Sequence, residues 1–224
     1  MSWVDIYYPL ASWVEITPRN SWAETEWGSQ TNWSRSSAET VLALRGQPHR
    51  WLANRRLAKY LSHAYDVYAK RPMGERSYLF LGDLKHQALH VSVAYGPAEG
   101  DRLGTLRRLV RAEDPELLRP PAVDTFHAGH LGEGLKALGH VELDDNDIVA
   151  NLWYAFRDEH HSVDVVVFAS TGDLVRLGQV MPDIDALVHG IKVRADDEDG
   201  WWAGVTDDIP VDAKSDAATD AGGN

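Results

Sequence analysis

Two short segments of the sequence place a histidine two residues before a serine. They are the tetrads His-Val-Ser-Val at 90–93 and His-His-Ser-Val at 160–163, and both fit a pattern of histidine, any residue, hydroxyl and apolar residue. Histidine titrates near neutral pH, so two such segments could supply a general acid and a general base. A chain with ten histidines also produces so short a pattern by chance. The ordinary interpretation is one histidine on a strand and two in an exposed turn.

The paired tetrads resemble the two motifs of the two-histidine phosphoesterases. This resemblance implies His90 and His160 as the acid-base pair and Ser92 and Ser162 as ligands of the phosphate. The second tetrad, however, begins in a predicted hairpin turn, whereas the family places both motifs on strands in two symmetrical lobes. The chain shows no internal repeat. Phosphoesterase activity is therefore the alternative to a non-enzymatic function.

A second group of histidines offers ligands for a metal ion. His127 and His130 flank a glycine-bearing loop, Glu133 or Asp124 could complete a tetrahedral set, and further histidines follow at 140, 160 and 161. The spacing is permissive, and the chain has no cysteine and no His-Glu-x-x-His segment. The glycines at 129–134 lack the strand-to-helix setting of a phosphate-binding loop. We predict no metal and no other cofactor, and leave open whether a small molecule binds.

Tryptophan and arginine indicate binding surfaces more directly than the histidines indicate catalysis. Six of the nine tryptophans lie in the first 51 residues, and the polar segment 20–37 is predicted to be a loop over the body. Its Trp22, Trp27 and Trp33 either plug the edge of the core or form an aromatic surface for a partner. Arg55 and Arg56 lie off the apolar stripe of a predicted helix. They are either ordinary solvated residues or part of a basic face shared with the arginines at 102–111.

The negative charge is concentrated at the C-terminal end. Eleven acidic residues against three basic ones from Asp183 onward account for -8 of the net charge of -12, so the body is nearly balanced and we expect no broad affinity for nucleic acid. Residues 195–224 are predicted to be an acidic, mostly disordered tail. Trp201 and Trp202 stand inside it, and such a tail has no need of adjacent tryptophans unless something covers them. We predict that residues 196–211 dock as a peptide, on basic helices of the same chain or in a partner's groove.

Hydrophobic periodicity predicts a single domain over residues 1–194, with strands and helices in mixed order. The strand at 163–169 is expected at the centre of the sheet, and Pro182 is expected to break the last helix. The predicted strands are 3–8, 13–16, 77–81, 89–95, 134–143, 148–156, 163–169 and 191–194, and the predicted helices are 48–71, 103–110 and 173–188.

The order of elements from Asp124 onward resembles the end of PsbP-like domains: a meander, a strand ending in Ala-Ser, a helix with Pro-Asp-Ile-Asp-Ala-Leu at 182–187, and a short last strand. Residues 8–14, Tyr-Pro-Leu-Ala-Ser-Trp-Val, look like their opening strand and turn. The resemblance implies an α/β (α+β) protein, an α/β/α sandwich whose largely antiparallel sheet is flanked by helices. The superfamily has no common catalytic site, so the resemblance implies a binding role and transfers no residue.

Composition indicates the compartment. The absence of cysteine excludes a disulfide framework and fits a reducing environment. The N-terminal residues contain no basic leader with an apolar run, and no stretch approaches the ~20 apolar residues of a membrane span. We therefore expect a cytoplasmic protein without membrane association. The leading prediction is a non-enzymatic binding or accessory protein that engages a protein partner through Trp201, Trp202, Trp22, Trp27, Trp33, Arg55 and Arg56.

Overall fold

Strands and helices alternate irregularly along the chain. The structure is a computed structural model of the whole chain that describes residues 2–16, 27–48, 50–69, 75–82, 84, 87–143 and 147–195. None of the helices in these ranges is both long enough and apolar enough to cross a lipid bilayer. The strands are β1 (Ser2–Ile6), β2 (Trp13–Ile16), β3 (Glu75–Phe80), β4 (Leu89–Pro97), β5 (Ala122–Ala128), β6 (Gly132–Glu142), β7 (Ile148–Asp158), β8 (Val163–Thr171) and β9 (Ile191–Ala195), and the helices are α1 (Gln30–Leu44), α2 (Trp51–Tyr68), α3 (Arg102–Leu109) and α4 (Leu174–His189).

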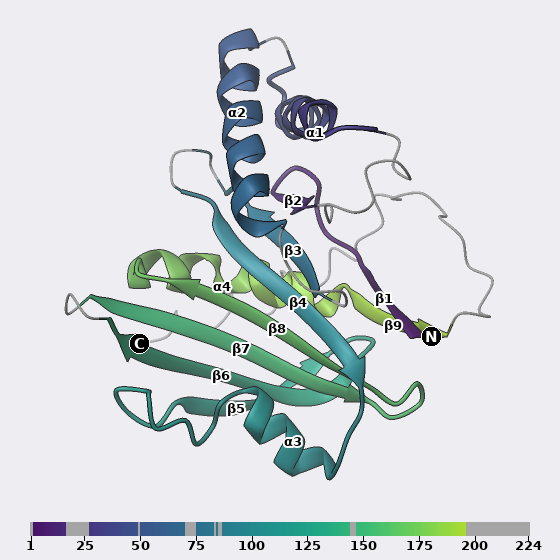
Figure 1. Cartoon of the computed structure of the whole chain (residues 1–224), viewed down its shortest axis with the longest axis vertical. Coiled ribbons are helices and arrows are strands. Elements are labelled where there is room, and N and C mark those ends of the chain that lie inside the picture. The colour runs from purple at the N-terminus through teal and green to yellow at the C-terminus, as the bar shows by residue number, and fades with distance from the viewer. Residues whose placement is uncertain are drawn as a thin grey trace, which may run out of the picture.

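Seven strands form one antiparallel sheet in the order β2-β3-β4-β8-β7-β6-β5 (Figure 1). Strand β8 occupies the middle place, as its run of β-branched residues predicts. Strands β1 and β9 pair separately as a two-stranded antiparallel sheet, which joins the two ends of the described chain. The predicted class, mixed α and β with a largely antiparallel sheet, is confirmed.

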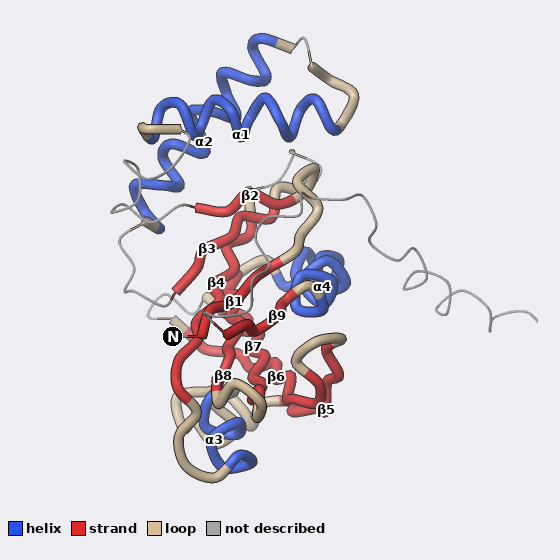
Figure 2. The backbone as a smooth tube through the Cα atoms, turned by 90° about the vertical axis from the view of Figure 1, so that its right-hand side faces the viewer, coloured by secondary structure: helices blue, strands red, loops and turns tan. Residues whose placement is uncertain are grey.

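Helices cover both faces of the large sheet. Because successive strand residues point to opposite faces, the side chains of Trp153 and Tyr154 in β7 lie on opposite faces of the sheet. Tyr154 belongs to a core with Ile184 of α4 and with strands β1 and β9, whereas Trp153 packs with Leu106 of α3. Helices α1 and α2 form a third core with the edge strands β2 and β3. Figure 2 shows this α1–α2 hairpin standing beyond the β2 edge, away from the other helices.

Helix α1 corrects the prediction of a loop over residues 20–37, because the chain is helical from Gln30 onward. Ser29 caps the helix, its hydroxyl accepting a hydrogen bond from the amide of Asn32. The buried residues follow the helical period although most of the surrounding sequence is polar. They are Trp33, Ser34, Ala38, Val41 and Leu42.

Helix α4 corrects the prediction that Pro182 breaks the last helix. The helix runs without interruption from Leu174 to His189. Proline removes one backbone hydrogen bond, to the carbonyl four residues earlier at Gly178. Apolar residues on both sides of it, among them Leu177 and Ile184, are buried in the same core. Packing against the sheet therefore outweighs the local cost of the proline.

Gly190 sits where α4 turns into β9, and there is no room for a side chain. A β-carbon at this position would overlap the carbonyl oxygen of Tyr7, whose amide donates a hydrogen bond to the Gly190 carbonyl at 2.9 Å. We expect Gly190→Ala to lower the free energy of unfolding by about 1–3 kcal/mol through overpacking. Gly178→Ala is the matched control, since its methyl group meets nothing within 4 Å. Urea denaturation of both variants checks this, and equal stability would refute the steric explanation.

Candidate functional site

The two histidine tetrads are not brought together. His90 lies at the start of β4, where its ring stacks on Tyr68 of α2 at 4.0 Å, and His160 lies in the turn between β7 and β8. The paired region of β4 and β8 runs from Val91 opposite Ala169 to Pro97 opposite Val163. The two histidines lie beyond its opposite ends, and its length alone is about 20 Å. No phosphate could touch both, so His90, Ser92, His160 and Ser162 do not form a catalytic site.

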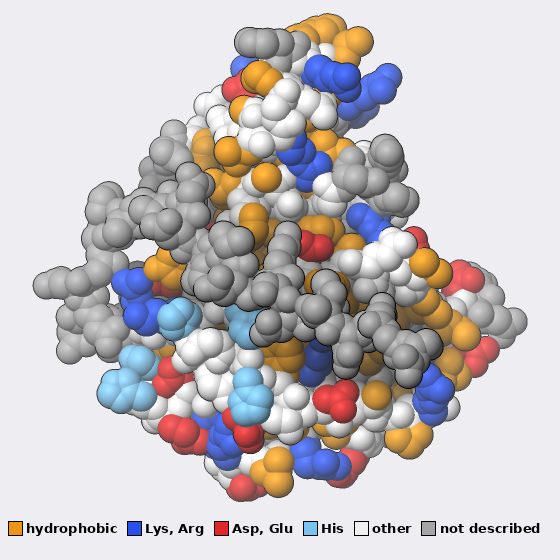
Figure 3. All heavy atoms as spheres, turned by 180° about the vertical axis from the view of Figure 1, so that it is seen from behind, with side chains coloured by type: hydrophobic (Ala, Val, Ile, Leu, Met, Phe, Trp, Pro, Cys, Tyr) orange, Lys and Arg blue, Asp and Glu red, His pale blue; other side chains and the backbone are white. Residues whose placement is uncertain are grey.

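His127, which lies in β5, and His130, in the turn after it, do not form part of a metal centre either. Within the described ranges, no three side chains of the metal-binding types are grouped so that they could hold an ion. His127 and Glu133 face each other at 3.8 Å between Nε2 and Oε2, and both are well exposed. Histidine side chains gather on one part of the back surface, next to acidic and basic groups (Figure 3).

Arg76 ties the two sheets together. Its Nε and one terminal nitrogen donate to the Glu15 carboxylate at 2.8 Å each, and the other donates to the Val4 carbonyl at 2.7 Å. Tyr8 donates to the same carboxylate and packs edge-on against Tyr78. Burial, and next the negative charge of Glu15, raise the pKa of both phenols well above 10.0. All three guanidinium nitrogens are engaged in holding β1 against β2 and β3, which is a structural role.

A second cluster joins α4 to the sheet. Asp185 of α4 accepts a hydrogen bond from Tyr154 at 2.5 Å and an ion-paired hydrogen bond from Lys136 at 2.7 Å. The Lys136 ammonium also lies over the rings of Phe126 and Tyr154. Burial, and then the hydrogen bond to Asp185, raise the pKa of Tyr154. The polar groups of Asp185, Tyr154 and Lys136 are one another's hydrogen-bond partners between α4 and the large sheet, so their role is structural.

The two buried phenols allow a matched comparison at neutral pH. Tyr154→Phe removes a hydrogen bond to a carboxylate and should lower the free energy of unfolding by about 1.5–3 kcal/mol. The Tyr78 hydroxyl is buried and has no hydrogen-bond partner among the residues that the structure describes. Tyr78→Phe should therefore leave stability unchanged or raise it by about 1 kcal/mol. Chemical denaturation at pH 7 measures both, and an equal loss in the two variants would count against these assignments.

Of the predicted tryptophans, the two that the structure describes, Trp27 and Trp33, pack against the core of the hairpin. Trp33 is 1% exposed and packs against Tyr65 of α2, with ring centroids 5.6 Å apart. Trp27 is half-buried against the same core. Trp33 thus has no surface to offer a partner, and its assignment as a partner-binding residue is wrong. Trp22, Trp201 and Trp202 lie outside the described residues.

The basic helices do not lie side by side, so the predicted joint face does not exist. Figures 1 and 2 place α2 and α3 at opposite ends of the molecule. On and beside α3, the arginines are largely paired: Arg102 with the Glu133 backbone carbonyl and the Glu159 carboxylate, Arg107 with Glu113, and Arg111 with Asp114. At α2, by contrast, the exposed side chains of Arg50, Arg55 and Arg56 form no hydrogen bond or ion pair within the described chain. These guanidinium groups are available to a partner.

Large apolar side chains are exposed beside these arginines. Trp51 is 67% exposed, Leu52 61% and Leu44 58%. The Arg55 guanidinium lies 5.8 Å from the centre of the Trp51 ring, a cation-π contact. We call Leu44, Arg50, Trp51, Leu52, Arg55 and Arg56 the hairpin tip surface.

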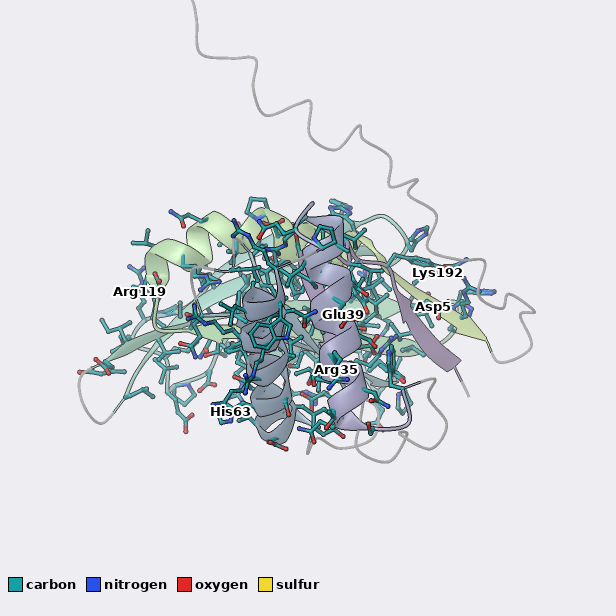
Figure 4. All side chains as sticks on the ribbon, turned by 90° about the horizontal axis from the view of Figure 1, so that it is seen from above. Asp5, Arg35, Glu39, His63, Arg119 and Lys192 are labelled. Carbon is teal, nitrogen blue, oxygen red and sulfur yellow. The ribbon has the colours of Figure 1, made fainter. Side chains whose placement is uncertain are left out.

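The hairpin tip surface is hollowed by an open groove. The groove has a volume of about 440 Å³ and is lined by Arg50, Trp51, Leu52, Ala53 and Arg56. Hydrophobic and basic side chains stand together at this end of the molecule (Figure 3). Figure 4 looks down on the hairpin and shows Arg35 and Glu39 on α1 and His63 on α2. The surface thus combines apolar anchors with unpaired positive charge.

A second exposed apolar region lies at the far end of the large sheet. We call it the sheet-end patch, and its members are Leu118, Leu143, Ile148, Leu174 and Val175. Its groove is smaller, about 210 Å³, and is lined by Leu118, Arg119, His140, Ile148 and Leu174. The sheet-end patch and its groove contain one arginine and no exposed aromatic ring, whereas the hairpin tip surface contains three arginines and an exposed tryptophan. The hairpin tip surface is the better candidate because tryptophan and arginine dominate binding energies at protein interfaces.

No protein-family model matches the sequence, and no curated protein matches it. The PsbP-like resemblance is therefore still a prediction. Function has to be inferred from the surface itself.

Proposed function

We propose that the protein is a non-enzymatic binding or accessory protein on a PsbP-like scaffold, and that it engages protein partners through the hairpin tip surface. The proposal is carried by one observation: two exposed large apolar side chains, Trp51 and Leu52, line one open groove together with Arg50 and Arg56, whose side chains form no hydrogen bond or ion pair within the described residues. A folded protein gains nothing by exposing tryptophan and leucine together, whereas a binding site does.

The energetics favour a peptide as the ligand. Burying a large apolar side chain contributes roughly 1.5–3 kcal/mol, so Trp51, Leu52 and Leu44 could supply most of the affinity of a short segment. The arginines add orientation and faster association with an acidic partner, and discriminate against basic ones. The groove is open rather than enclosed, which suits an extended or helical segment better than a small molecule. The expected ligand is a protein segment with apolar anchors flanked by carboxylates.

Further support comes from what the histidines do. His90 is engaged with Tyr68 and lies far from His160, so the phosphoesterase alternative loses its catalytic pair. A cytoplasmic location belongs to the same proposal and is supported by the absence of cysteine.

Peptide display tests the proposal. A random peptide library is selected on the full chain and, in parallel, on Trp51→Ala/Arg55→Glu/Arg56→Glu. We expect acidic sequences with aromatic or large apolar residues to be enriched on the first and not on the second. The control Leu174→Ala/Val175→Ala removes two side chains of the sheet-end patch and should preserve the enrichment. Equal enrichment on the native chain and the tip variant, or none on either, would disprove the proposal.

A further inference from the structure

We infer that, when no partner is present, the hairpin tip surface is occupied by residues 196–211 of a second copy of this chain. The inference rests on the proposed function, because it assigns an occupant to the same surface. It adds self-association as a means of regulation.

The two segments have complementary chemistry. Residues 27–69, which contain the hairpin, hold six Lys and Arg residues and two acidic ones. Residues 196–211 hold six acidic residues and no basic one, and four of the six stand directly before Gly200 and the Trp201-Trp202 pair. The segment thus combines carboxylates with large apolar anchors, which is the ligand that Trp51 and the unpaired arginines favour.

Reach decides between the same chain and a second copy. Six residues separate Trp201 from Ala195, the end of β9, and an extended chain of that length spans at most ~20 Å. Helix α2 has 18 residues, and is about 27 Å long. In Figures 1 and 2, the N-terminal end of α2 carries the hairpin tip and its C-terminal end points toward the large sheet. Strand β9 lies beyond that C-terminal end. Trp201 therefore falls short of its own hairpin tip, so a Trp201-Trp202 pair bound at that surface comes from another molecule.

Each chain then contributes one surface and one segment. Two copies that exchange their segments form a closed dimer, and a non-reciprocal arrangement extends into longer assemblies. In either case the segment competes with an outside partner. A partner of higher affinity would displace the segment and dissociate the assembly. The hairpin tip surface would thus be covered whenever such a partner is absent.

Peptide binding is the direct test. A labelled synthetic peptide of residues 196–211 is titrated by fluorescence anisotropy into full-length Trp201→Ala/Trp202→Ala, whose own segment is disabled. We expect saturable binding that weakens at least about 100-fold when Arg55→Glu/Arg56→Glu is added, and that rising salt weakens as well. A peptide with both tryptophans replaced by alanine should not bind.

Sedimentation equilibrium tests the exchange between copies. The mass of the native chain should rise with concentration above 25.0 kDa, whereas Trp201→Ala/Trp202→Ala and Arg55→Glu/Arg56→Glu should each stay monomeric. A mixture of these two variants keeps one intact surface and one intact segment, and should form heterodimers. A native chain that stays monomeric at every concentration overturns the inference. If library peptides bind and the 196–211 peptide does not, the inference fails and the proposed function stands; if neither binds, both fail.

Discussion

The protein is expected to unfold steeply as the pH rises above 10. Burial raises the pKa of Tyr8, Tyr78 and Tyr154 above the ordinary value of 10.0. In the unfolded chain these phenols lose their protons near pH 10, while the folded protein retains them, so the folded state binds more protons and its stability falls with pH. Each phenol contributes about 1.4 kcal/mol per pH unit, or roughly 4 kcal/mol for the three together. Against a typical total of about 5–15 kcal/mol, most of the stability is gone near pH 12.

Urea denaturation at pH 7, 10, 11 and 12 measures this dependence. Tyr154→Phe should remove up to about one third of the slope above pH 10, because it removes one of the phenols whose pKa burial raises. Recovery of the circular dichroism spectrum on return to pH 8 separates unfolding from chemical damage. A free energy of unfolding that stays constant between pH 10 and pH 12 would show that the phenols are not buried as described.

Charge reversal at two arginines should abolish binding of acidic peptides while the fold is unaffected. Arg55→Glu/Arg56→Glu replaces two attractive contacts with two repulsive ones, and we expect at least a ~100-fold loss of affinity, equivalent to about 3 kcal/mol. Both residues are exposed and their side chains form no hydrogen bond or ion pair within the described chain, and glutamate is as good a helix former as arginine. Stability should change by less than about 0.5 kcal/mol. Isothermal titration calorimetry and thermal denaturation measure the two quantities.

The control variant makes the same change in net charge at a different part of the surface. Arg108→Glu/Arg119→Glu alters two exposed arginines that lie on α3 and at the sheet-end patch. It gives the same net charge as the tip variant. We expect the affinity for the peptide to change less than about twofold, since these residues lie beyond the range of screened charges. An equal loss in both variants would mean that net charge, and not the hairpin tip surface, governs binding.

The fold was predictable where local pattern and tertiary packing agree. In α2, the spacing of the apolar residues from Leu57 to Tyr68 is enough to predict which face of the helix is buried. In β8, the run of β-branched residues likewise predicts a buried strand. Helix α1 was missed because its buried positions include Ser34 and its exposed face is rich in serine and threonine. Strand β5 was missed because it is the exposed edge of the sheet and carries polar residues such as Asp124 and His127. The prediction of a break at Pro182 was wrong because it considered only the local effect of proline on a helix, and the packing of α4 on the core outweighs that effect.

The candidate site was only half predictable. Arg55 and Arg56 could be placed on the outer face of their helix from the apolar stripe alone. Leu52 offered a signal that was overlooked: it precedes Leu57 by five residues, about 140° of helical rotation, so it had to face water. Leu44 is the last residue of α1, so its place relative to α2 depends on how the two helices pack, which no local pattern reveals. The histidine tetrads failed because spacing along the chain says nothing of strand order, and antiparallel pairing put them at opposite ends of β8.

The most direct test of the hairpin tip surface as the binding site is to map its amide chemical shifts by NMR during titration with a selected acidic, aromatic peptide. Peptide binding at the hairpin tip surface predicts perturbations at Leu44 and from Arg50 to Arg56, together with the indole proton of Trp51. Perturbations confined to the sheet-end patch around Leu118, Ile148 and Leu174, or none at saturating peptide, would contradict it.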